Sequence, residues 1–333
     1  MVTETAQIQR WHTEDIDEQS DLLSGWEQEY RQLSCGKFIG NVSTAHGPRI
    51  AVVGEQTNQS LHEIVVPPAG ALVFALVLND DDALQVNRRQ VKTTSLLVLE
   101  GGKEYDFRTN GSTELLGVAL EREWLFENHD SRHTALVEDA LKRNVVPLDG
   151  MGTSLLRNFW LVLSQILQRE ADWPANMPLT LVADTALSNI LLALNMCRPL
   201  SAASPLVSST REVTITQQAI RFMRANLDRN CSIEDVCAAI HVSRRTLHNH
   251  FQKSLHMSPQ QYLKALRLNA ARGLLRAAAA RQDHLIRQPN IAEIAAQCGY
   301  DHASRFAGDY KRQFGMLPSD VLRETARPEA MQT

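Results

Sequence analysis

A helix-turn-helix pattern occurs twice in the last third of this chain, and the repeat limits the possible folds more than any other feature. The first copy covers residues 232–251 and the second covers residues 290–315. The matching apolar positions are Ile233 with Ile291, Val236 with Ile294, Cys237 with Ala295, Ile240 with Cys298, Val242 with Tyr300 and, after a one-residue insertion in the second turn, Leu247 with Phe306 and Phe251 with Tyr310. One such pattern often arises by chance. Two copies joined by a long helical segment predict an all-α domain of two helix-turn-helix units.

The first copy contains the local signals for a helix, a turn and a second helix. Ser232 followed by Asp235 is similar to a capping box, and Ser243 is a suitable N-cap for the next helix. His241 and Gly299 occupy the equivalent turn position, where we expect a positive φ; glycine adopts it freely and histidine is enriched there. Further helices are predicted at residues 214–226 and 259–280.

The second helix of each copy has an outward side that matters for function. Leu247 and Phe251 are four residues apart and are predicted to face the core, so the opposite side faces outward. In the first copy, the outward positions of the second helix are Arg244, Arg245, His248, Asn249, Gln252 and Lys253. The second copy presents Ser304, Arg305, Ala307, Gly308 and Arg312. An apolar underside with a basic, hydrogen-bonding upper side is typical of a reader of the DNA major groove. The alternative is a helical hairpin with a solvated charged face.

The net charge of −4 conceals opposite balances in two parts of the chain. Residues 211–333 contain 18 Lys and Arg against 11 Asp and Glu, a net charge of +7, whereas residues 1–210 contain 16 against 27, a net charge of −11. This asymmetry indicates that only the C-terminal part meets a polyanion such as double-stranded DNA.

Longer motifs in this region carry a resemblance to a known family. They are Val242-Ser243-Arg244-Arg245-Thr246-Leu247, Pro259-Gln260-Gln261-Tyr262-Leu263, Arg267-Leu268-Asn269-Ala270 and Gly299-Tyr300 with Phe306, Tyr310, Phe314-Gly315 and Pro318-Ser319. Residues 215–323 resemble the AraC/XylS family of bacterial transcription regulators. The resemblance implies base contacts by Arg245, His248 and Asn249, and activation of transcription together with RNA polymerase. On the second copy, Arg305 and Arg312 are expected to contact phosphates.

Residues 37–120 change to short apolar runs separated by turn residues such as Gly47-Pro48 and Asn110-Gly111. Strands are predicted at residues 37–44, 49–56, 61–66, 71–78, 94–99, 104–108 and 114–120. The chain is therefore expected to be α+β, with an N-terminal antiparallel β-barrel or cupin-like domain with helices and a C-terminal all-α domain. Such a barrel holds a small molecule in its mouth.

Helical patterns occur on both sides of these strands. A short amphipathic helix is predicted at residues 21–33 and two apolar helices at residues 151–170 and 179–196. Phe159, Trp160, Leu163 and Leu167 give the first apolar helix a wide face, which predicts a homodimer contact. The alternative is that the second apolar helix covers this face within one chain.

These patterns define four segments. Residues 1–20 are expected to be a disordered tail because they are polar and acidic. Residues 21–198 form the effector-binding and dimerisation domain, and residues 199–211, rich in Pro, Ser and Ala, form a linker. The DNA-binding domain covers residues 212–327.

A carboxylate in the N-terminal domain is the candidate effector residue. The motifs Gly36-Lys37-Phe38-Ile39-Gly40 and Glu55-Gln56-Thr57-Asn58 resemble the subgroup that contains the ethanolamine-operon regulator. Its members respond to different small molecules, so the effector's identity stays open. The resemblance implies a ligand-responsive activator of a catabolic operon. Glu55 would meet a cationic effector inside the barrel; the alternative is an exposed carboxylate at a strand end.

No pattern predicts catalysis, a cofactor or a metal. The N-terminal histidines lack paired metal-ligand spacing, and no phosphate loop or nucleophile elbow occurs. Two other functions stay open: an effector-independent regulator or repressor, and a DNA-repair enzyme fused to an AraC-type domain. The second needs clustered cysteines near the N-terminus, where Cys35 stands alone. Scattered cysteines, and no apolar run near the ~20 residues that cross a bilayer, predict a cytoplasmic protein without a membrane partner.

Overall fold

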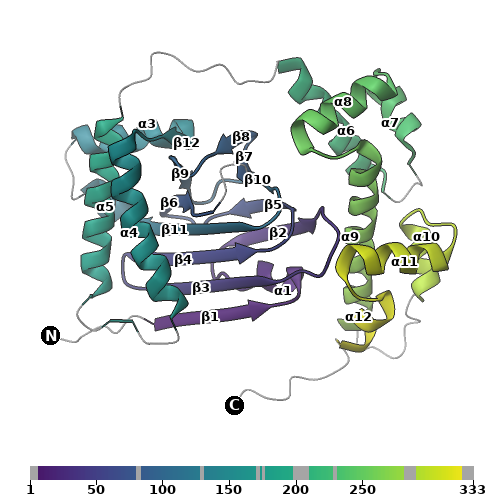
Figure 1. Cartoon of the computed structure of the whole chain (residues 1–333), viewed down its shortest axis with the longest axis horizontal. Coiled ribbons are helices and arrows are strands. Elements are labelled where there is room, and N and C mark those ends of the chain that lie inside the picture. The colour runs from purple at the N-terminus through teal and green to yellow at the C-terminus, as the bar shows by residue number, and fades with distance from the viewer. Residues whose placement is uncertain are drawn as a thin grey trace. The chain divides into compact units, whose positions relative to one another are not determined.

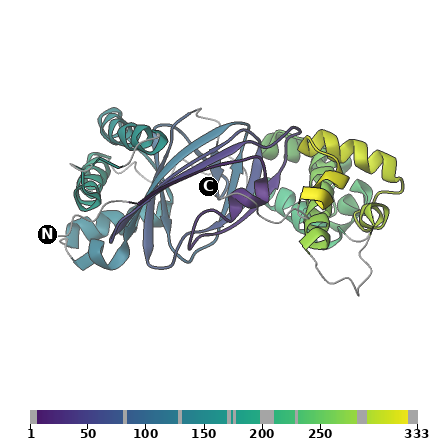
Figure 2. The same ribbon diagram turned by 90° about the horizontal axis from the view of Figure 1, so that it is seen from below.

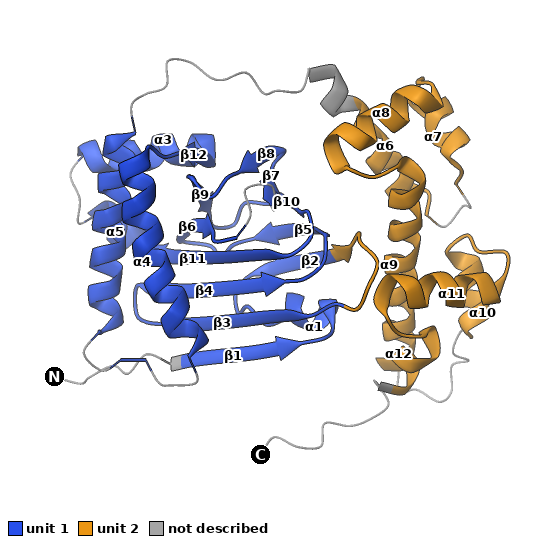
Figure 3. Cartoon of the chain, viewed as in Figure 1, with its two compact units in different colours: residues 1–30, 38–203 blue, residues 31–37, 204–333 orange. Residues whose placement is uncertain are grey.

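The chain folds into two compact units, which Figures 1 and 3 show. The computed structural model describes residues 7–79, 84–127, 131–169, 173–174, 177–197, 210–227, 231–280 and 290–324. Unit 1 consists of Met1–Tyr30 and Phe38–Ala203, and unit 2 consists of Arg31–Lys37 and Ser204–Thr333. The expected linker at residues 199–211 lies outside the described residues except at its last two positions.

Two sheets form the body of unit 1. The seven-stranded sheet has the order β1-β3-β4-β11-β6-β9-β12, and the five-stranded sheet has the order β2-β5-β10-β7-β8. The strands of the first are β1 (Gln7–Thr13), β3 (Gly40–His46), β4 (Ile50–Thr57), β6 (Ala71–Val77), β9 (Ser95–Glu100), β11 (Thr113–Glu121) and β12 (Val145–Pro147). Those of the second are β2 (Glu27–Gln32), β5 (Leu61–Val66), β7 (Leu84–Val86), β8 (Arg89–Val91) and β10 (Tyr105–Thr109).

The strands pair in an antiparallel manner, as expected, but the two sheets are not closed into a barrel. All seven predicted strands are present with slightly shifted ends. Sequence reasoning missed β7, β8 and β12, because three residues are too few to show a period of two. Apolar side chains from both sheets, among them Val65, Ala75 and Phe107, pack into one core.

The first thirty residues differ from expectation. The segment expected to be a disordered tail contains β1 and the helix α1 (Ile16–Ser20), although residues 1–6 lie outside the described part. The polar sequence of β1 is held by backbone pairing with β3, and the Ile16 side chain is buried. The helix predicted at residues 21–33 is wrong. Gly25 interrupts it with a φ of +79°, and β2 begins two residues later.

Helices cover the seven-stranded sheet, and Figure 2 shows them grouped at one side of the strands. They are α2 (Arg122–Glu127), α3 (Ser131–Arg143), α4 (Gly150–Gln168) and α5 (Leu179–Met196). The wide apolar face of α4 is buried within one chain, since Trp160, Leu163 and Leu167 have 0% exposure. The indole N–H of Trp160 donates to the carbonyl of Leu116 in β11 at 3.1 Å. Trp160, Leu163 and Leu167 are therefore not available for the expected dimer contact, because α5 and the sheet cover them, whereas Phe159 is half-buried.

By length and composition alone, α5 is apolar enough to cross a membrane. Half of that stretch is buried inside unit 1, and its buried side chains include Leu187, Ile190 and Leu194. A core helix of a globular domain has the same composition.

Unit 2 is helical, and one long helix connects its two halves (Figure 1). Its helices are α6 (Thr210–Ala225), α7 (Ile233–Ala239), α8 (Arg244–Leu255), α9 (Pro259–Ala280), α10 (Ile291–Gln297), α11 (Ala303–Phe314) and α12 (Pro318–Glu324). Ser258 and Gln261 form a capping box at the start of α9, because Gln261 N–H donates to Ser258 Oγ at 3.2 Å and Ser258 N–H donates to Gln261 Oε1 at 2.8 Å. The two halves have separate cores, to which α9 contributes Tyr262 and Leu266 on one side and Leu268 and Leu275 on the other.

Candidate functional site

The first helix-turn-helix unit has the backbone that its sequence predicts. Ser232 and Asp235 cap α7 reciprocally, and their hydrogen bonds lower the pKa of the Asp235 carboxyl. His241 adopts a φ of 55° in the turn. Ser243 Oγ then accepts from the Thr246 N–H at 3.0 Å and starts α8. These contacts satisfy backbone donors that would otherwise be unpaired, so they set the direction in which α8 leaves the turn.

The outward face of α8 is available for a ligand. Leu247 and Phe251 have 0% exposure and anchor the helix. All six outward residues of the prediction are exposed: Arg244, Arg245, His248, Asn249, Gln252 and Lys253. Arg244 Nη1 lies 2.7 Å from Glu234 Oε1, which is an exposed ion pair of small energetic weight. Arg245, His248 and Asn249 make no side-chain hydrogen bond or ion pair within the described part of unit 2.

The second unit repeats this frame with a different surface. Asn290 and Glu293 form a second capping box, which sequence reasoning missed although the Asn-x-x-Glu spacing signals it. Gly299 adopts a φ of +76° in the turn, as expected. Ser304, Arg305, Gly308 and Arg312 of α11 are exposed, and Ala307 is half-buried.

An acidic residue adds to the contrast between the two outward faces. Asp309 lies on α11 and pairs with Lys264 Nζ at 2.7 Å and with Arg312 Nη1 at 3.5 Å. The guanidinium of Arg312 is therefore partly engaged within its own helix. The face of α11 has fewer long hydrogen-bonding side chains than the face of α8.

Residues 31–37 complete unit 2 from a distant part of the sequence. Gln32 Nε2 donates to the carbonyl of Gln313 at 2.7 Å, and Gln313 Nε2 donates back to the carbonyl of Gln32 at 2.9 Å. Asn269 of α9 also donates to the Gln32 carbonyl at 2.9 Å. Leu33 joins the core of the first helix-turn-helix unit. Sequence reasoning missed this role, because contacts across more than 200 residues leave no local pattern.

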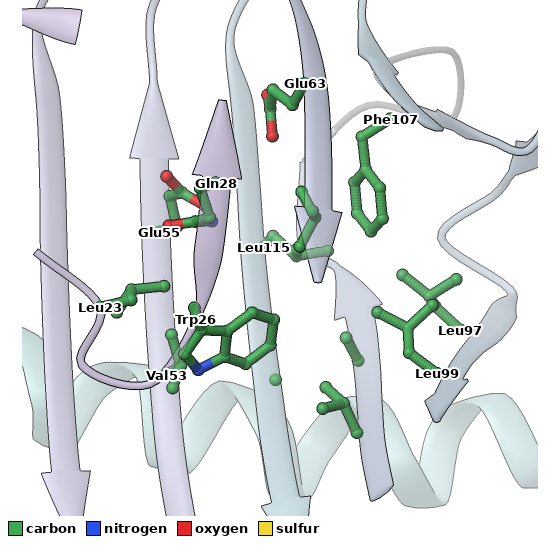
Figure 4. A pocket seen from close by; sticks show the side chains of 14 residues that line it. Leu23, Trp26, Gln28, Val53, Glu55, Glu63, Leu97, Leu99, Phe107 and Leu115 are labelled. Carbon is green, nitrogen blue, oxygen red and sulfur yellow. The ribbon is translucent and has the colours of Figure 1, made fainter. Parts of the chain in front are cut away.

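Unit 1 contains a cavity between its two sheets, shown in Figure 4. The cavity and the open space at its mouth together contain about 460 Å³ of atom-free space. Glu55 of β4 faces this cavity, and its Oε1 accepts from Tyr30 Oη at 2.5 Å and from Gln19 Nε2 at 2.8 Å. Burial raises the pKa of Glu55, while these hydrogen bonds oppose the rise. The alternative of an exposed strand-end carboxylate is therefore wrong.

A second carboxylate lines the same cavity and was missed from the sequence. Glu63 of β5 is only 6% exposed. Burial, and then the negative charge of Glu55, raise the pKa of Glu63 well above its usual value. The sequence contained a signal for this burial. Glu63 lies between Leu61 and Val65 at a spacing of two residues, so all three side chains point to the inward face of the strand. Among the described residues, no cluster of three His, Cys, Asp or Glu side chains has the arrangement of a metal site.

Comparison with known proteins is consistent with this geometry. Residues 236–324 match a family model described as a helix-turn-helix domain. The chain is 34% identical over 114 residues to the XylDLEGF operon transcriptional activator of Pseudomonas putida, a match that covers 34% of each protein. It is 28% identical over 217 residues to the probable thc operon regulatory protein of Rhodococcus erythropolis, covering 63% of this chain and 61% of that protein.

One solved structure, of an AraC-type DNA-binding regulator from Chromobacterium violaceum, matches with 28% identity and a TM-score of 0.31. The match covers 36% of this chain and 98% of that one. The match to the Pseudomonas putida activator spans about a third of that relative's length.

Proposed function

Because this chain carries an AraC-type helix-turn-helix domain, we propose that it is a sequence-specific, DNA-binding transcription regulator that acts by binding and not by catalysis. The observation that carries the proposal is the exposed outward face of α8, which presents Arg245, His248 and Asn249 on a helix anchored by a buried underside. Such a helix is of a size and chemistry that the DNA major groove accepts.

The first unit supplies the base contacts in this proposal. Arginine pairs with guanine edges and asparagine with adenine edges, so Arg245 and Asn249 read bases, and His248 lies on the same face. Arg244, Gln252 and Lys253 are at the margin of this face and contact the DNA backbone. The ion pair of Arg244 with Glu234 is exposed at the surface, so it exchanges for a phosphate contact at little cost.

The second unit mainly positions the protein. Ser304 and Gly308 have small side chains, which let the DNA backbone approach α11 closely. Arg305 and Arg312 then contact phosphates, which fix register without carrying sequence information.

We also propose that unit 1 binds a small-molecule effector in the cavity lined by Glu55, and that this binding controls a catabolic operon. The Pseudomonas putida relative is a transcriptional activator, which supports activation by this chain together with RNA polymerase. The site of action is the cytoplasm, where the DNA lies. A homodimer would present two reading helices to paired half-sites. The contact of such a dimer would not use Trp160, Leu163 or Leu167, because these side chains are buried within unit 1.

In vitro selection from a random DNA pool tests the proposal. Full-length protein should enrich one motif, and the Arg245→Ala variant should enrich a motif that is degenerate at one base pair. Arg276→Ala on α9 serves as the matched control and should recover the parental motif. Failure of the parental protein to enrich any sequence contradicts the proposed function. Reporter transcription with the selected site then separates an activator from a repressor.

A further inference from the structure

The cavity of unit 1 brings two carboxylates together from opposite sheets. Glu55 lies on β4 of the seven-stranded sheet, and Glu63 lies on β5 of the five-stranded sheet. Figure 4 shows both side chains beside the same space. Their β-ladder partners are apolar, because Leu115 is opposite Glu55 and Phe107 is opposite Glu63. Among the described residues, no Lys, Arg or His lines the cavity.

The two carboxyl groups differ in the hydrogen bonds that the protein donates to them. Tyr30 and Gln19 both donate to Oε1 of Glu55. Glu63 is more than nine-tenths buried, and no group among the described residues donates a hydrogen bond to its carboxyl. A buried carboxylate without a partner is costly, and a second negative charge nearby increases the cost. Burial therefore favours the neutral form of Glu63 in the ligand-free protein, and a positive charge bound beside both groups would favour its carboxylate form and pair with it.

Apart from Gln28, the remainder of the described lining is apolar and suits a short hydrocarbon. Trp26, Val53, Leu97 and Leu99 surround the space beside the carboxylates. The face of an indole ring attracts a cation as well as apolar groups. A bare metal ion fits this lining poorly, because it needs several oxygen ligands whereas the cavity offers mostly carbon.

We propose that this cavity binds a small organic cation, with its ammonium group between Glu55 and Glu63 and its hydrocarbon part against Trp26 and the neighbouring aliphatic side chains. The inference rests on the proposed function, because it assigns a chemical class to the effector. An ammonium group carries three hydrogen-bond donors, so one ligand reaches both carboxylates and supplies the donor that Glu63 lacks.

A matched set of probes tests this class on the full-length protein: butylamine, 1-butanol and butyric acid, which share a chain length and differ in charge. Thermal unfolding is followed in buffer of constant pH and ionic strength. Butylamine should raise Tm by about 2–4 °C once it exceeds its Kd roughly tenfold, because it binds only the folded state. Butanol and butyrate should leave Tm unchanged. Equal shifts with the alcohol or the acid, or no shift with the amine up to about 50 mM, overturn the proposal.

Variants assign the response to the carboxylates. Glu63→Gln keeps the side-chain shape, so it should raise the Tm of the ligand-free protein and abolish the butylamine shift together. A merely structural role predicts a lower Tm instead. Glu55→Gln should also abolish the shift. The control Glu104→Gln, at an exposed carboxylate outside the cavity, should leave both values unchanged. An undiminished amine response in Glu63→Gln contradicts the proposal.

DNA binding is measured on the same samples to separate the two levels of inference. If the protein binds its selected DNA but butylamine has no effect, the assigned ligand class fails and the regulator function stands. If DNA binding itself is absent, the proposed function fails whatever the amine does.

Discussion

The two helix-turn-helix units share one backbone plan and differ in surface. Helices α7 and α10 contain seven residues each, and α8 and α11 contain twelve each. Both units begin with a capping box, and both end in a left-handed residue, His256 in the first and Gly315 in the second. The outward face of α8 carries long polar side chains, whereas that of α11 carries Ser304 and Gly308 among its exposed positions. The helix-turn-helix fold therefore constrains the backbone and the core residues of both units, whereas the outward-facing residues are free to differ between them.

The turns show where even the frame differs. Both turn residues have a positive φ, at His241 and at Gly299. A side chain at Gly299 would also meet the guanidinium of Arg267, with Cζ 3.0 Å from the position of a Cβ atom. His241 is exposed. The first turn therefore requires only a residue that adopts a positive φ. The second turn requires a positive φ and also the absence of a side chain, because Arg267 lies close to Gly299.

The largest expected effect comes from the two buried aromatic anchors. Phe251→Ala and Phe306→Ala each remove a ring with 0% exposure, so each should lower the free energy of unfolding by about 3–5 kcal/mol. Denaturant unfolding of the full-length protein measures both. Leu274→Ala, at a side chain 39% exposed, is the control and should have a small effect. If only one aromatic variant is destabilised, the cores of the two units do not depend equally on their aromatic anchors.

The next effect concerns DNA recognition. Arg245→Ala should lose about 1–3 kcal/mol of binding free energy on the selected site and less on random DNA, because a base contact is lost. Arg305→Ala should weaken binding to the selected site and to random DNA by a similar amount, because phosphate contacts carry no sequence information. Fluorescence anisotropy at fixed salt concentration measures both affinities. Equal losses by Arg245→Ala on the two DNAs would mean that the first unit does not read sequence.

The turn difference predicts unequal responses to one substitution. Gly299→Ala should destabilise unit 2 by about 1–2 kcal/mol, because alanine is strained at this φ, and Arg267 must also move. His241→Ala exchanges one side chain for another at a strained position and should change stability by less than about 1 kcal/mol. Thermal unfolding compares them. A larger loss at His241 would show that its imidazole has a role beyond the turn.

The smallest effect concerns how the reading helices start. Ser243→Ala removes a cap bond to Thr246 and should lower stability by about 1 kcal/mol. His302, at the equivalent position before α11, makes no side-chain cap bond, so His302→Ala should have almost no effect. Hydrogen exchange in the first turn of each helix measures the fraying locally. Equal protection losses in both helices would contradict this distinction.

Local physical chemistry explains why the helix-turn-helix units were predictable. Capping residues act on backbone groups within three positions, and apolar periodicity reports which face of a helix is buried. The exposed face of α8 and the turns at His241 and Gly299 follow from such short-range signals. The same reasoning found the longer strands of unit 1 and the helices α4 and α5.

The sequence by itself therefore determined the two-part organisation, the helix-turn-helix repeat and the residues on its outward faces, because these depend on neighbours a few positions away. Only the tertiary structure decided that β2 replaces a helix, that α5 and the sheet cover Trp160, and that residues 31–37 join unit 2. It also decided that Glu63 shares a cavity with Glu55. The physical reason is that sheet pairing, burial and a carboxylate's electrostatic surroundings depend on segments that folding brings together from distant parts of the chain.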